Sequence, residues 1–108
     1  MANAYKVLGQ TGDAFTAPVD IYTATGVEAI VSTIVVCNRS AASKTFDISV
    51  RPAGATEANQ HYIAKSTSIG ANDSITLTLG ITLEATDVIT VTASTADVSF
   101  SVFGTEIS

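Results

Sequence analysis

The chain has 108 residues, the length of one domain, of which 46% are apolar and 14% are charged, and its net charge is −5. This composition excludes a disordered chain, and the excess of Asp and Glu over Lys and Arg argues against a nucleic-acid-binding surface. No run approaches the roughly 18 consecutive apolar residues of a membrane-spanning helix. We therefore expect a single domain over residues 1–108 that binds neither nucleic acid nor a membrane.

The first third of the chain contains two weak strand patterns, over residues 4–8 and 19–24, and one unusual pattern. Residues 28–38 have two largely apolar faces, where a half-buried strand has one. The pattern predicts a central strand covered on both sides, or a strand whose outer face meets another subunit. One expected face consists of Ala29, Val31, Thr33, Val35 and Cys37, and the other of Ile30, Ser32, Ile34 and Val36.

Four later stretches alternate apolar and polar residues with the period of two that indicates a half-buried strand. Their apolar side chains, such as Ile48, Leu77 and Leu79, are expected to face the core. The opposite face consists mainly of Thr and Ser, and Thr suits a pleated surface because it is β-branched. The stretches are 44–51, 74–79, 88–94 and 98–103, with weaker candidates at 61–65 and 81–83 and a loop over 53–60.

Three of the predicted strands begin directly after an aspartate, namely Asp73, Asp87 and Asp97. An aspartate side chain can bond the nearby backbone and fix the turn before a strand. We therefore expect three antiparallel neighbours joined by tight connections. The alternative is that the three carboxylates gather at one end of the sheets, where they could bind Ca²⁺. Turn fixing is the favoured interpretation because the three local sequences are alike.

The sequence predicts an all-β fold. Seven or eight short strands at a spacing of roughly 10–12 residues are typical of an antiparallel β-sandwich or a jelly-roll-like domain. No stretch of ten residues shows a convincing helical stripe.

Candidate catalytic groups are few. Cys37 is the only cysteine and lies in an apolar stretch, which favours a small buried side chain. His61 is the only histidine, so a His-rich metal site is excluded, and a structural or surface role is favoured over ligand contact. No nucleophile-elbow or phosphate-loop motif occurs. We expect no catalytic residue, no cofactor and no metal site, and hence not an enzyme.

Several segments of the chain resemble small structural proteins of tailed bacteriophages, notably phages of aquatic bacteria and cyanobacteria. The resemblance spans most of the chain and implies a virion component, but it carries no functional residues. Residues 1–6 lack the pattern of a secretory signal, so assembly in the host bacterial cytoplasm is expected. The segments are YKVLGQ (5–10), VSTIVVCNR (31–39), RPAGA (51–55), HYI (61–63), AND (71–73), LTLG (77–80) and FGTEI (103–107).

The leading hypothesis is a capsid decoration or cement protein that binds the major capsid protein and forms a homo-oligomer, expected to be a trimer. One alternative is a tail, baseplate or fibre-associated adaptor. Another is a host-glycan-binding module, for which loop aromatics such as Phe15 or Tyr62 would have to line a binding surface. The residues predicted to form the subunit interface are Ala29, Val31, Thr33, Val35, Arg39, Arg51 and Phe103.

Overall fold

The structure is a computed structural model that describes residues 3–15 and 17–107, with only the backbone described for Asn3 and Leu79. Two expectations fall partly outside this description. The segment expected to lack a secretory signal includes Met1 and Ala2, and the Leu79 side chain was expected to face inward.

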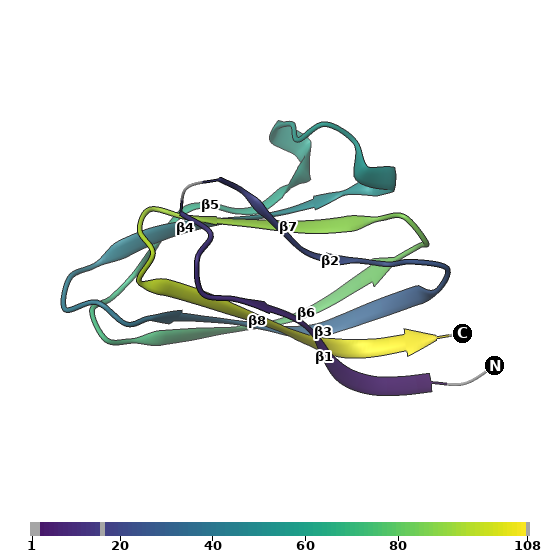
Figure 1. Cartoon of the computed structure of the whole chain (residues 1–108), viewed down its shortest axis with the longest axis horizontal. Coiled ribbons are helices and arrows are strands. Elements are labelled where there is room, and N and C mark those ends of the chain that lie inside the picture. Colours follow the sequence, from purple (N-terminus) through teal and green to yellow (C-terminus); the bar gives the residue numbers. More distant parts are fainter. Residues whose placement is uncertain (1–2, 16, 108) are drawn as a thin grey trace.

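Two antiparallel four-stranded sheets pack face to face, which confirms the predicted all-β sandwich (Figure 1). One sheet has the strand order β1-β8-β3-β6 and the other has the order β2-β7-β4-β5. All eight predicted strands are present, and residues 81–83 extend the strand before them. The strands are β1 (Asn3–Thr11), β2 (Val19–Thr23), β3 (Glu28–Asn38), β4 (Lys44–Arg51), β5 (Tyr62–Ile69), β6 (Ser74–Leu83), β7 (Val88–Ala93) and β8 (Val98–Ile107).

Each strand of the first half of the chain pairs with its mirror in the second half: β1 with β8, β2 with β7, β3 with β6, and β4 with β5. Every connection crosses from one sheet to the other, except the link from β4 to β5. The expectation that the last three strands are neighbours in one sheet is therefore wrong. Strands β6 and β8 both flank β3, whereas β7 lies in the opposite sheet.

The core lies between the two sheets and is built from the inward residues of the alternating strands. Phe46 of β4 and Phe100 of β8 meet edge to face, with ring centroids 6.1 Å apart and planes at 74°. Because these rings belong to opposite sheets, their contact joins the two layers, and such a pair contributes about 0.5–1.5 kcal/mol beyond its buried area. The largest fully buried side chains also include Ile34, Ile48, Ile69, Leu83, Ile89, Val31, Val36, Val91, Val98 and Val102.

Strand β3 changes phase in its middle, which corrects the two faces expected from its sequence. Its register with both neighbouring strands shifts between Val31 and Thr33, at Ser32. One extra residue moves every later side chain to the opposite face of the sheet. The inward side chains are therefore Ala29, Val31, Ile34, Val36 and Asn38, and the outward ones include Ile30, Thr33, Val35 and Cys37.

All four edge strands are irregular. In each of them one to three residues of the edge strand have no partner in the neighbouring central strand, so the ladder is interrupted. Bulged edges are poor templates for adding another strand, and they protect a sheet against edge-to-edge association. The unpaired positions are Leu8 in β1, Ile21 in β2, residues 65–66 and 63 in β5, and residues 79–80 in β6.

The segment between β4 and β5 is mainly loop, as predicted, but it contains two single 3₁₀ turns at Pro52–Gly54 and Asn59–His61. It folds back beside the outer side of the sheet β2-β7-β4-β5 (Figure 1). This placement explains why Ser49 and Thr90, which were expected to face water, are buried.

Candidate interaction surface

The outer side of the sheet β1-β8-β3-β6 carries the most ordered surface pattern of the molecule, and we call it the A face. Residues directly opposite each other in neighbouring strands project to the same side of a sheet, so the registers define rows across the four strands. Four such rows are Tyr5–Thr105–Ile30–Thr82, Val7–Phe103–Thr33–Thr78, Gln10–Ser101–Val35–Thr76 and Ser99–Cys37–Ser74.

The A face is apolar at one end and covered with hydroxyl groups at the other. In the first two rows Tyr5 is 81% exposed, Val7 49% and Ile30 41%, and Phe103 lies half-buried between them. The last two rows consist mainly of Ser and Thr, with the side-chain amide of Gln10 donating to Ser101 Oγ at 3.2 Å. Large exposed apolar side chains on a folded domain, when they cluster, mark an interaction site.

None of the side chains in the four rows is charged. Glu28 stands at the margin, opposite Ile107. Lys6 belongs to β1 but forms a salt bridge of 2.6 Å with Glu106, whose carboxylate also accepts a hydrogen bond of 2.7 Å from the Tyr22 hydroxyl of the other sheet. The A face is therefore an uncharged surface on a protein with a net charge of −5.

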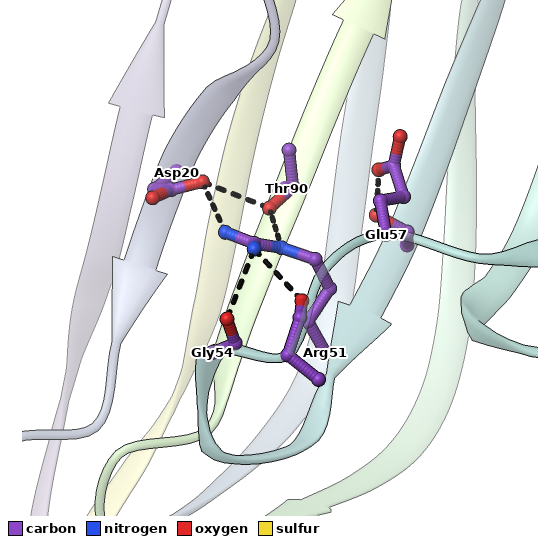
Figure 2. A network of polar contacts seen from close by, with 7 residues as sticks. Asp20, Arg51, Gly54, Glu57 and Thr90 are labelled. Carbon is purple, nitrogen blue, oxygen red and sulfur yellow. Dashed lines mark hydrogen bonds and ion pairs between the residues drawn. The ribbon is translucent and has the colours of Figure 1, made fainter.

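The outer side of the sheet β2-β7-β4-β5 has the opposite character, because a charged network occupies it (Figure 2). Arg51 donates from Nε to Thr90 Oγ1 at 3.0 Å, from Nη2 to Asp20 Oδ1 at 2.9 Å, and from Nη1 to the carbonyls of Gly54 and Ala55. The Thr90 hydroxyl also donates to Asp20, at 2.9 Å. This network holds the start of the β4–β5 loop against the sheet.

Glu57 attaches the second half of the same loop. Its carboxylate accepts hydrogen bonds from the Ser49 hydroxyl at 2.5 Å and from the Tyr62 hydroxyl at 2.8 Å. The bond to Glu57 raises the pKa of the Tyr62 phenol, and burial raises it further. Lys65 lies 4.7 Å from the centre of the Tyr62 ring, and its hydrogen bond to Asp47 raises the pKa of its ammonium group. The polar groups around this loop are therefore bonded to one another.

The structure does not bring all the predicted interface residues together. Thr33, Val35 and Phe103 lie on the A face. Ala29 and Val31 are fully buried in the core, so a partner cannot reach their side chains.

The two arginines of that predicted set lie elsewhere. Arg39 donates from Nη2 to the carbonyls of Gly12 at 3.1 Å and Ala96 at 2.6 Å, and so bridges two loops. Arg51 belongs to the network on the opposite sheet.

Sequence reasoning missed the large exposed apolar residues of the A face, namely Tyr5, Val7 and Ile30. Tyr5 and Val7 alternate along a stretch that was predicted as a weak strand, which is a signal that they share a face. Ile30 was assigned to the other face of its strand because the bulge at Ser32 has no signature in the local sequence.

The candidate chemical groups lie apart. Cys37, which was expected to be buried, lies half-buried on the A face. His61 ends the 3₁₀ turn before β5 and accepts the backbone N–H of Ala58 at Nδ1, at 3.0 Å. The carbonyls of Asp73 and Asp97 accept N–H groups at the end of β3, from its last residue and from the next one. The carbonyl of Asp87 accepts an N–H just after β2, at the opposite end of the sandwich. The alternative in which the three aspartate carboxylates gather at one end of the sheets is therefore wrong. Among the described residues, no three His, Cys, Asp or Glu side chains form a group that could hold a metal.

Two of these aspartates fix turns, as predicted. Asp73 accepts the N–H of Ser74 at 2.8 Å. Asp87 accepts the N–H of Glu84 at 2.9 Å and also that of Ala53, in the distant β4–β5 loop. No such side-chain bond is described for Asp97, whose N–H instead donates to Thr95.

A shallow pocket of about 160 Å³ lies on the sheet β2-β7-β4-β5, away from the A face. Its only carboxylate, Asp47, is bonded to the N–H of Ser66 at 2.7 Å and to Lys65 at 3.3 Å. Neither Phe15 nor Tyr62 lines it. The residues around it are Thr45, Phe46, Asp47, Ser66, Thr92, Ala93 and Ser94.

Within the described residues, no helix has the length and apolar character needed to cross a membrane. Comparisons of the chain with protein-family models, curated proteins and solved structures found no match.

Proposed function

We propose that this chain is a structural protein of a phage virion, and more specifically a capsid decoration or cement protein that binds the major capsid protein. On this proposal the protein acts by binding other subunits and catalyses no reaction. The A face is the observation that supports this role best, because it offers exposed apolar and hydroxyl groups without a charged side chain in its rows.

The strand order gives a second line of support. The mirrored pairing of the first four strands with the last four is the arrangement expected when two Greek keys form a jelly roll. Viral capsid domains and lectins are among the proteins that use jelly rolls. A fold alone does not identify a function, so this support is only as strong as the surface that the fold presents.

The resemblance to small phage structural proteins supplies the virion context. Four of its segments include parts of the A face, namely residues 5–10, 31–39, 77–80 and 103–107, which contribute for example Tyr5, Thr33, Thr78 and Phe103. Another segment contains Arg51, which holds the β4–β5 loop. The resembling segments therefore contribute both to the candidate surface and to the structure that supports the opposite sheet.

Quantitative mass spectrometry of purified virions, with heads and tails separated before the measurement, tests the proposal. A decoration protein should remain with the heads, in a copy number that scales with the number of major capsid subunits. Reconstruction of the particle should then place it on the outer surface of the shell. Recovery with the tails alone, in a few copies, would support the tail adaptor instead, and absence from the virion would overturn both assignments.

A further inference from the structure

We infer that the A face binds a second copy of this chain, so that two sandwiches pack face to face around a two-fold axis. The inference deepens the proposed structural role and rests on it, because it names one partner and the surface that binds it. It implies two subunits, where the sequence alone led us to expect three.

Charge selects the A face for this contact. Two copies, each with a net charge of −5, repel one another, and the repulsion is strongest where carboxylates are brought together. On the opposite sheet, three carboxylates (Asp20, Asp47 and Glu57) accompany two cations (Arg51 and Lys65). The four rows of the A face contain no charged side chain, so two copies can meet there without placing like charges in contact.

The irregular edges of the sheets favour association of two copies through a sheet face over association through an edge strand. A continuous ladder between two copies would need an edge strand with regularly spaced N–H and C=O groups. All four edge strands are bulged, at Leu8 in β1, Ile21 in β2, residues 65–66 in β5 and residues 79–80 in β6. Pairing through an edge is therefore disfavoured at each of them.

The A face also has the size and layout of a small interface. Four strands about 4.8 Å apart and about eight residues long, at about 3.3 Å per residue, cover roughly 500 Å². In full overlap, two such faces would bury roughly 1,000 Å² in total, which is the lower limit for a specific contact. Tyr5, Val7, Ile30 and Phe103 would form its apolar centre, and the Ser and Thr rows its polar rim.

A two-fold arrangement follows from this layout. In a two-fold contact the same patch is used by both subunits. Placing the axis near the first two rows of the A face lays the apolar residues of one copy on those of the other.

Sedimentation velocity of the whole chain over a range of concentrations tests the inference, with Val7→Glu and Ile63→Glu as matched variants. Val7 and Ile63 are β-branched, 49% and 47% exposed, and both lie in edge strands, but only Val7 is on the A face. We expect the wild-type chain to dimerise, Val7→Glu to weaken dimerisation at least tenfold, and Ile63→Glu to leave it unchanged. Circular dichroism verifies that both variants fold.

A charge swap separates a lost contact from a lost fold. Val7→Lys and Val7→Glu should each fail to dimerise alone, while an equal mixture should recover dimers, because opposite charges then face one another. A misfolded variant would not recover in this way.

A wild-type chain that stays monomeric at about 1 mM, where even millimolar dissociation constants are detected, would overturn the inference. A trimer, or equal weakening by Val7→Glu and Ile63→Glu, would overturn it as well. These outcomes concern the isolated chain, so they are distinct from failure of the virion proposal, which is decided by the presence of the protein in heads.

Discussion

At the scale of single residues, Arg51 illustrates how a surface side chain can organise a long loop. Its guanidinium group bonds a carboxylate, a hydroxyl and two carbonyls that belong to three different parts of the chain. A planar fork with five donors can serve all these groups at once, which an ammonium group cannot do.

Arg51→Ala should lower the free energy of unfolding by about 1–3 kcal/mol, because it leaves two loop carbonyls without this donor and Asp20 with only the Thr90 hydroxyl. Chemical denaturation monitored by circular dichroism measures this. Arg51→Lys keeps the charge near Asp20 and should give an intermediate loss. If Arg51→Ala unfolds at the same denaturant concentration as the wild type, the network does not stabilise the fold.

Because of Glu106, the stability of the fold should decrease at acidic pH. The hydrogen bonds from Lys6 and Tyr22 lower the pKa of the Glu106 carboxyl, with Lys6 as the larger cause. Because the folded-state pKa lies below the unfolded one, this contribution to stability is complete above the unfolded pKa, about 4.3, and is lost as the pH falls through the folded pKa.

In Glu106→Gln, the loss of thermal stability between neutral and acidic pH should therefore be smaller than in the wild type. Glu84→Gln removes an exposed carboxylate that has no salt bridge among the described residues, and so controls for the change in net charge. Identical pH profiles for Glu106→Gln and the wild type would contradict the role of Glu106.

At the scale of the secondary-structure elements, the backbones of the two sheets come close together where β1 passes β2. A Cβ atom added to Gly9 would lie 2.1 Å from the carbonyl oxygen of Ile21, which is backbone and cannot move aside freely. Gly80, in the edge strand β6, has nothing within 4 Å of the same added atom.

Gly9→Ala should destabilise the protein by about 1–3 kcal/mol, because β1 must shift away from β2 to accommodate the methyl group. Gly80→Ala should be nearly neutral and serves as the matched control. Thermal unfolding of the two variants measures the difference, and equal melting temperatures would show that β1 and β2 are free to separate.

The strand positions were predictable, whereas the facing of the side chains was predictable only in regular strands. Alternation located β4 to the residue, because a half-buried strand must place apolar residues on one side. The stretch with two apolar faces located β3 to the residue. The phase change in β3 could not be predicted, since the extra residue Ser32 is revealed only by the register of β3 with its neighbouring strands. For the same reason Ile30 was assigned to the wrong face, although its presence in a strand was correct.

At the scale of the whole molecule, the sequence predicted two packed sheets but not which strands share a sheet. The three Asp-initiated strands looked like neighbours because their local sequences are alike. Similar local sequences indicate similar turns before the strands, but they do not indicate which strand pairs with which. The A face combines residues of four strands that are distant in the sequence, so it could only be found once the strand order was known.

If two copies pair through the A face, their association should strengthen as salt is added. The four rows that would form the contact contain no charged side chains, so they offer no electrostatic attraction for salt to weaken. Salt does screen the repulsion between two molecules that each carry a net charge of −5. Dissociation constants measured by sedimentation at low and high sodium chloride test this. A dissociation constant that rises with salt would indicate that ion pairs hold the copies together.

The central position of β8 affects when the protein can assemble. This strand is the last of the eight to leave the ribosome, yet it lies between β1 and β3 and completes the sheet. Until β8 inserts, Tyr5 and Val7 are not held beside Ile30, and the A face does not exist. Chains that have not been synthesised through β8 therefore cannot recognise one another through this surface, so the ability to associate arises only after β8 has been made.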